Sequence, residues 1–306
     1  MQFSIYQQSR RGARKSNQDR IAYCYSRDAL LMLVADGMGG HRHGEMAAET
    51  AMQSITAAFR REARPGLPDP RAFLRRAISA AHRAIVENAA AAKLPEAPRT
   101  TCVACVVQEG AACWAHAGDS RLYLIRHGTV LAQTKDHSLV QQLIDRGRIR
   151  EESVAAHPER NQIFNCLGSQ KPPRVDLSEL TRLDSGDTLL LCSDGLWGPL
   201  SSKIISGAML KHGIMQAVPE LLDEAERRAG RECDNLSVVA LTWEGQSAAA
   251  RPVQPADHAA ASELAASRPQ ETSGAGRQSD TLSDEEIERA ITRIRRAMKG
   301  HTNGQT

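Results

Sequence analysis

Short acidic motifs at the ends of apolar runs constrain this chain more than any other feature of its sequence. They are Asn17-Gln18-Asp19, Asp36-Gly37-Met38-Gly39-Gly40, Ala117-Gly118-Asp119-Ser120-Arg121, Ser193-Asp194-Gly195 and Asp234-Asn235. Each places an aspartate where a strand-like run begins or ends, so the carboxylates can meet at one point of a folded domain. Without cations such a cluster would repel itself. Oxygen ligands with no His or Cys among them favour Mg²⁺ or Mn²⁺ over zinc.

Each motif, taken alone, has a simpler explanation. Asp and Gly are common turn and helix-cap residues, and a strand-to-helix turn with an Asp cap would produce the segment from Asp36 to Gly40 equally well. The prediction of a metal site therefore rests on all of the motifs together.

Apolar periodicity along residues 2–243 predicts a mixed domain. Strands are predicted at 2–8, 20–26, 29–35, 101–108, 112–117, 120–126, 129–133, 175–183, 187–192 and 236–243, and helices at 44–62, 70–92, 199–211 and 214–229. Turn residues between several strands favour antiparallel hairpins. We therefore predict that residues 1–245 form an α+β domain, in which two packed antiparallel β-sheets are flanked by α-helices in α-β-β-α layers.

Charge and hydropathy exclude several classes of protein. The net charge of +3 is too small to indicate binding to nucleic acid or to a membrane surface. No apolar stretch approaches the roughly 20 residues that span a bilayer, and the first residues lack the apolar core of a signal peptide. We expect a cytoplasmic protein.

The cysteines do not indicate a disulfide framework or a zinc site. There are seven, an odd number, and only Cys102 and Cys105 form a CxxC pair. These two lie in a predicted strand, where positions three apart face opposite ways. Core packing is the expected role of both.

Three segments depart from the pattern of the domain. Residues 138–165 are polar and weakly periodic, which favours a mobile surface excursion. Residues 246–282 have almost no large apolar groups and are predicted to be a disordered linker. Residues 283–299 predict an amphipathic helix, which begins with a capping box of Ser283 and Glu286. It would be either a docking element for a partner or for the domain itself, or a frayed tail.

The motifs, in their order along the chain, resemble those of the metal-dependent Ser/Thr protein phosphatases of the PPM (type 2C) family, in their compact bacterial form. The resemblance covers about residues 3–243. It rests on R-x-x-x-Q-D from Arg14 to Asp19, VADGMGG at 34–40, TT at 100–101, AGDSR at 117–121, KDHS at 135–138, LLLCSDGLW at 189–197 and DNLSV at 234–238.

The resemblance implies a role for each of these residues. Two Mn²⁺ or Mg²⁺ ions would be held by Asp36, the Gly37 carbonyl, Asp194 and Asp234. Asp19 would orient the waters of these ions. Asp119, with Asp194, would hold a third ion, and Arg14 would grip the substrate phosphate. Residues 138–165 would correspond to the flap beside the active site.

The resemblance also implies a function. A water that bridges the two ions would attack phosphoserine and phosphothreonine in phosphorylated proteins, in opposition to a bacterial Ser/Thr kinase, and the chain would act as a monomer. The alternative is a catalytically inactive member that binds phosphoproteins or another partner. Two residues depart from the family pattern: Gln18 replaces a Glu of many members, and Met38 replaces the His that is the proposed general acid of eukaryotic members.

Overall fold

The computed structural model describes residues 1–38, 43–150, 157, 159 and 162–245. The predicted linker 246–282 and helix 283–299 lie outside the described residues, as do His41 and residues 151–156, 158, 160 and 161 of the predicted flap. Within the described part of the chain, no helix combines the length and the apolar character needed to cross a membrane.

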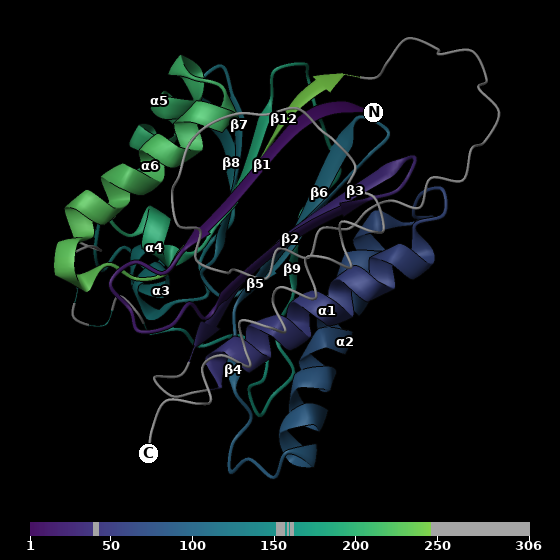
Figure 1. The fold of residues 1–306 in the computed structure, drawn as a ribbon, viewed down its shortest axis with the longest axis vertical. Helices are drawn as coiled ribbons and strands as arrows, with labels where there is room; N and C mark the ends of the chain where they lie inside the picture. Colours follow the sequence, from purple (N-terminus) through teal and green to yellow (C-terminus); the bar gives the residue numbers. More distant parts are fainter. Residues whose placement is uncertain (39–42, 151–156, 158, 160–161, 246–306) are drawn as a thin grey trace, which may run out of the picture. The chain divides into compact units, whose positions relative to one another are not determined.

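Two antiparallel sheets form the centre of the fold (Figure 1). The first, here called the β1 sheet, has the order β1 (Gln2–Arg10), β12 (Leu236–Gly245), β11 (Thr188–Cys192), β7 (Arg121–Arg126) and β8 (Thr129–Gln133). The second, the β3 sheet, has the order β10 (Thr181–Arg182), β6 (Ala111–Ala117), β5 (Cys102–Gln108), β3 (Ala29–Met38) and β2 (Asp19–Tyr25). Two short strands extend it: β9 (Asp176–Leu177) pairs with β6, and β4 (Arg99–Thr100) pairs with β3.

Helices cover the outer face of each sheet (Figure 1). α1 (Gly44–Glu62) and α2 (Pro70–Ala91) pack on the β3 sheet, and α5 (Ser202–Lys211) and α6 (Ile214–Ala229) pack on the β1 sheet. Strand β3 shows how the layers arise, because its side chains alternate between two cores. Leu31 and Leu33 face the helices, whereas Leu30, Met32 and Val34 face the β1 sheet. The predicted α-β-β-α architecture is confirmed.

The same alternation explains the CxxC pair. Cys102 packs against the helices, and Cys105 lies between the two sheets. All seven cysteines are buried and free. Burial raises the pKa of the Cys102 thiol to about 12. The predicted packing role of Cys102 and Cys105 is confirmed.

The structure differs from the sequence-based prediction in several short elements, including β4, which was not predicted. The predicted strand 175–183 is two two-residue strands, β9 and β10, separated by a loop. Part of the segment predicted as a mobile excursion is instead a helix, α3 (Leu139–Asp145). Ser138 caps this helix by accepting from Gln141 N at 3.3 Å, and Val140 is buried.

Candidate metal centre

Two of the predicted residues face each other across neighbouring strands. Asp19 opens β2, Asp36 lies near the end of β3, and the two are direct partners in the antiparallel register. Burial raises the pKa of the Asp36 carboxyl, and the charges of Asp19 and Asp194 both act on it and raise its pKa further. Gly37 follows in β3, opposite Thr100 of β4. Like charges directly opposite on a sheet are destabilising, so this pair is not a device for stability.

The β1 sheet supplies two more aspartates. Asp194 begins the short helix α4 (Asp194–Trp197) directly after β11, and Asp234 precedes β12. At Gly195 a Cβ atom would lie 2.1 Å from the Asn235 carbonyl oxygen. Only glycine permits this close approach, which brings the start of α4 against the segment that carries Asp234.

The fifth aspartate, Asp119, lies in the turn between β6 and β7 and is 3% exposed. Burial, followed by the charges of Asp194 and Asp136, raises its pKa well above the usual range. The pKa of Asp36 is also raised well above the usual range. The largest cause is burial, followed by the charge of Asp19 and then by those of Asp194, Asp119 and Asp234. The structure therefore brings all five predicted aspartates into one electrostatically coupled cluster.

The cluster leaves carboxylate oxygens without partners. Oδ1 of Asp19, Asp119 and Asp194 is buried, and no described group donates a hydrogen bond to any of the three. Burial raises the pKa of Asp19 to about 6 and that of Asp194 to about 7. Buried polar groups are normally hydrogen-bonded, and hard divalent cations take carboxylate oxygens as ligands. The donor set thus fits Mg²⁺ or Mn²⁺.

Hydroxyl groups that the sequence reasoning did not single out fix these aspartates in place. Ser193 Oγ donates to Asp19 Oδ2 at 2.7 Å and accepts from the Ser237 amide at 3.0 Å. This contact ties the end of β11 to the start of β2, although the two strands belong to different sheets. The available sequence signal was the position of Ser193, directly before Asp194.

Two threonines hold the backbone of Asp36. Thr100 Oγ1 donates to the Asp36 carbonyl at 2.8 Å, and the Asp36 amide donates to Thr101 Oγ1 at 3.1 Å. Thr101 Oγ1 lies 2.6 Å from Ser120 Oγ, the neighbour of Asp119. The TT motif therefore links the Asp36 and Asp119 segments through side-chain hydroxyls.

Arg14 lies at the exposed side of the cluster. Its Nη2 donates to Asp234 Oδ2 at 2.6 Å, while 58% of its side chain remains exposed. The hydrogen bond and charge of Asp234, with smaller contributions from Asp194 and Asp36, raise its pKa. An arginine in this position can bind an anion that approaches from solvent.

Asn235 anchors the segment that carries Arg14. Its Nδ2 donates to the Arg11 and Ser16 carbonyls at 2.8 and 3.0 Å, and its Oδ1 accepts from the Gln18 amide at 2.8 Å. The loop between β1 and β2 is thus held against the start of β12. Arg14 and Asp19 reach the cluster because this loop is fixed at both ends.

A buried ion pair supports the Asp119 turn. Arg121 donates to both carboxylate oxygens of Asp136, at 2.9 and 2.7 Å. Its guanidinium carbon lies 3.7 Å from the ring centroid of Trp197, three residues after Asp194. Arg121 therefore connects the turn that carries Asp119 to the helix that begins with Asp194.

Comparison with known proteins identifies the family. A sequence profile of the family described as protein phosphatase 2C matches residues 6–228. The chain belongs to the protein phosphatase 2C family. The protein phosphatase PhpP of Streptococcus pneumoniae strain R6 is 34% identical over 219 residues, which cover 70% of this chain and 84% of PhpP.

Solved structures of phosphatases share the fold. The Ser/Thr phosphatase Stp1 of Staphylococcus aureus superposes with a TM-score of 0.73 at 29% identity, over 80% of this chain and 96% of Stp1. The catalytic domain of the Ser/Thr protein phosphatase PstP, solved with two manganese ions, superposes with a TM-score of 0.67 at 32% identity, over 78% of this chain and 97% of that domain. The family and the enzyme class expected from the motifs are confirmed.

This protein phosphatase 2C member has a second group of metal-ligating residue types. Ligand atoms of His116, His137 and Asp176 lie within 4.8 Å of one another. However, His137 Nδ1 accepts from the Gly118 amide at 3.2 Å, and its Nε2 lies 3.2 Å from Asp176 Oδ2. Asp176 is also paired with Arg174 at 2.8 Å. These atoms already have partners, so the group supports the turn at Gly118 and needs no ion.

The structure also shows where the two residues that depart from the family pattern, Met38 and Gln18, lie. Met38 ends β3, opposite Arg99 of β4. The Gln18 carbonyl accepts from the Gly37 amide at 3.2 Å, so Gln18 helps to hold the backbone beside Asp36. His43 occupies the N-cap position of α1, where its exposed side chain makes no capping hydrogen bond.

Proposed function

We propose that this protein phosphatase 2C member hydrolyses phosphoserine and phosphothreonine in proteins and acts against a Ser/Thr kinase. The observation that carries the proposal is the cluster of aspartates, three of which have a buried oxygen without a partner among the described residues, beside an exposed arginine. Asp36, the Gly37 carbonyl, Asp194 and Asp234 would hold two Mn²⁺ or Mg²⁺ ions. Asp119 and Asp194 would hold a third.

The chemistry would be divided between the ions and the side chains. When bound, the cations would activate a water for in-line attack on phosphorus and offset the charge of the phosphate. Arg14 would bind phosphate oxygens, because a guanidinium has five N–H donors and the Asp234 contact occupies one of them. Asp19 would accept a hydrogen bond from the attacking water, in an orientation set by Ser193.

No cysteine side chain is placed to act as the nucleophile. All seven thiols are buried, and burial raises the pKa of Cys24, Cys102 and Cys113 to about 12. A thiol in such surroundings stays protonated and inert. The proposed attack by water therefore has no competitor among the thiols of the chain.

The test measures phosphate release from a phosphothreonine peptide and from an aryl phosphate, with Mn²⁺, with Mg²⁺ and with chelator. We expect Asp36→Asn and Asp194→Asn each to lower turnover by about a hundredfold or more, because each removes a proposed ligand. Asp223→Asn, in an exposed ion pair, is the matched control and should change nothing. Full activity of both variants, or of the wild type in chelator, would refute the mechanism.

A wild type that is inert with every divalent ion, but binds the phosphopeptide, would favour the inactive binding member instead.

A further inference from the structure

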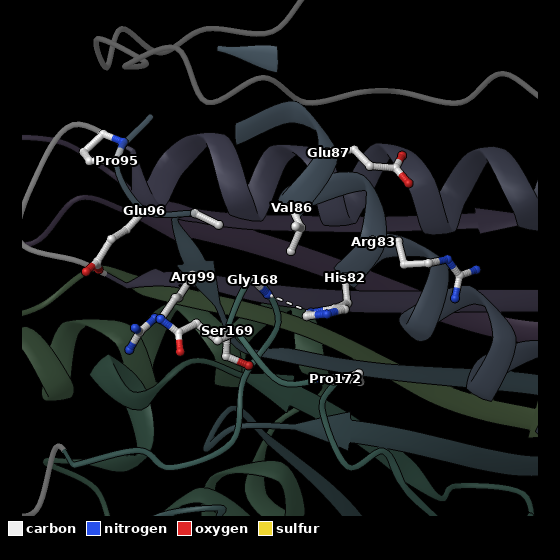
Figure 2. Close-up of a pocket in the computed structure, with 12 residues that line it drawn as sticks. His82, Arg83, Val86, Glu87, Pro95, Glu96, Arg99, Gly168, Ser169 and Pro172 are labelled. Atoms are coloured by element: carbon white, nitrogen blue, oxygen red, sulfur yellow. Dashed lines mark hydrogen bonds between the residues drawn. The ribbon is translucent and has the colours of Figure 1, made fainter. Parts of the chain in front are cut away.

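A groove of about 400 Å³ lies on the surface between α2 and the segments 95–99 and 168–172 (Figure 2). We propose that it docks the segment of the phosphoprotein that flanks the phosphorylated residue. The occupant would be an extended stretch with an aliphatic or prolyl side chain and an acidic residue. This inference rests on the proposed function and adds a substrate preference to it.

The groove is a built feature of the fold. The Gly168 amide donates to His82 Nδ1 at 3.1 Å, a bond that joins the 168–172 segment to α2 (Figure 2). Gly168 has φ +79°, and a Cβ atom there would lie 2.0 Å from the Pro98 carbonyl oxygen. Glycine is required for both reasons. The three walls are thus packed against one another at this residue.

The groove adjoins the metal centre through β4. Arg99 lines the groove, and the next residue, Thr100, holds the Asp36 carbonyl at 2.8 Å. An extended chain advances about 3.3 Å per residue, so a substrate bound at the centre can reach the groove within a few residues of its phosphorylated side chain.

The substrate cannot dock here by adding a strand. β4 pairs with β3 on one side. On its other side Thr100 and Leu167 exchange two backbone hydrogen bonds, at 3.2 and 2.9 Å. Neither edge of β4 is free to pair with a peptide, so side chains must carry the recognition.

The floor of the groove offers one polar and one apolar contact. His82 is 7% exposed, and burial lowers its pKa, so the ring is neutral. Because Nδ1 accepts from Gly168, the proton lies on Nε2, for which no described group is an acceptor. Val86, 38% exposed, points from α2 toward the space above His82, with Pro95 and Pro172 at the sides (Figure 2).

These contacts suit a peptide. The Nε2–H can donate to a peptide carbonyl, and Val86 with the two prolines can pack against an aliphatic or prolyl side chain.

The charge at the end nearest the centre favours an acidic flank. Arg99 is exposed, and no carboxylate among the described residues pairs with it. Both glutamates of the rim extend away from His82, Glu87 to the side opposite Arg99 and Glu96 to the side on which Arg99 lies (Figure 2). An acidic residue of the substrate would therefore meet an unpaired guanidinium beside β4.

The test uses the full chain with Mn²⁺ and compares phosphothreonine peptides that carry acidic or basic flanking residues with an aryl phosphate. We expect Arg99→Glu to lower kcat/KM for the acidic peptides about two- to fivefold and to raise it for the basic ones. Val86→Asp should lower kcat/KM about tenfold for all peptides, through KM. The matched controls are Arg75→Glu on the exposed side of α2 and Met215→Asp, an exposed apolar residue of α6.

An equal loss on peptides and aryl phosphate, or no reversal of charge preference in Arg99→Glu, would overturn the proposal. If the wild type turns over none of the substrates, the proposed function fails. Peptide affinity measured by fluorescence anisotropy then decides the docking proposal, which predicts that Arg99→Glu reverses the preference between acidic and basic peptides. If removal of residues 246–306 abolishes the effect of Arg99→Glu, the occupant is the chain's own C-terminal segment and the proposal is wrong.

Discussion

Asp119 and Asp136 are both buried, but their oxygens meet different surroundings. Both oxygens of Asp136 accept from Arg121, as both oxygens of Asp187 accept from Arg126 at 2.7 Å. Oδ1 of Asp119 has no partner in the described part of the chain. Outside the metal centre, Asp136 and Asp187 are each paired with an arginine, whereas at the metal centre some carboxylate oxygens have no hydrogen-bond partner among the described residues.

This difference shows which carboxylates serve stability and which serve function. A buried charge is tolerated when a partner and hydrogen bonds compensate its lost hydration. At the centre the compensation comes only in part from the protein, from Arg14 and from hydroxyls such as that of Ser193. The remainder must come from a bound cation or from protonation.

The largest expected effect comes from removing a carboxylate that is paired with a buried arginine. Asp136→Ala would leave the Arg121 guanidinium buried without its carboxylate and should lower the free energy of unfolding by about 3–5 kcal/mol. Asp223→Ala removes an ion pair of Arg10 in which the aspartate side chain is 70% exposed, and should cost under about 1 kcal/mol. Urea unfolding in chelator measures both. Equal losses would show that the buried pair contributes no more than a surface pair.

A smaller effect is expected at the mouth of the centre. Arg14→Ala should lower kcat/KM for a phosphopeptide about tenfold, because charge-assisted hydrogen bonds to phosphate are lost. Arg14→Lys should recover part of the loss, since the charge remains but the bidentate geometry does not. Steady-state kinetics measure this effect, with Arg27→Ala as an exposed control. If Arg14→Ala keeps its affinity for inorganic phosphate, Arg14 is not the phosphate ligand.

The stability of the metal-free protein should depend on pH through the aspartates of the metal centre. The pKa of Asp194 is raised to about 7, above the usual value near 3.9. Its protonation therefore stabilises the fold fully below about pH 4, and this contribution is lost as the pH rises through about 7.

In chelator we expect Asp194→Asn to be more stable than the wild type at about pH 8, by about 1 kcal/mol or more, with the advantage shrinking toward pH 4. Thermal unfolding across this range measures it. Added Mn²⁺ should stabilise the wild type more than the variant, because cation binding favours the folded state. A pH-independent difference would contradict the assigned pKa.

The smallest effect is expected from the thiols. Because all seven cysteines are buried and free, iodoacetamide at neutral pH should leave the phosphatase activity of the folded protein unchanged. Mass spectrometry of the treated protein counts the modified thiols. Rapid alkylation with loss of activity would place a reactive thiol at the centre.

Local sequence patterns predicted those parts of the fold that local forces determine. Strand β3 and the helices α1 and α2 follow from period-2 and period-3.6 apolar patterns. The two-residue strands β4, β9 and β10 could not be predicted, because pairing with a neighbour and not their own composition makes them strands. Helix α3 could not be predicted either, because only one of its residues, Val140, is buried, which leaves little apolar periodicity.

The candidate site shows the same limit. The motifs identified the five aspartates and Arg14, and the structure brings them together. Sequence could not show that Ser193 bonds Asp19 across 174 positions, or that Thr101 and Ser120 share a hydroxyl contact. The first contact depends on how the two sheets stack and the second on how β5 pairs with β6, and no local pattern encodes either.

The most direct test of the metal centre is calorimetric titration of the metal-free chain with Mn²⁺. We predict at least two bound ions per chain for the wild type. We also predict loss of binding in Asp36→Asn, because Asp36 is the register partner of Asp19 and its pKa is raised by burial and by the charges of the other four aspartates of the cluster. Asp136→Asn, altered only in the paired region, should keep the wild-type number of ions wherever it remains folded. If the wild type binds no Mn²⁺, or if Asp36→Asn binds as many ions as the wild type, the aspartate cluster is not a metal centre.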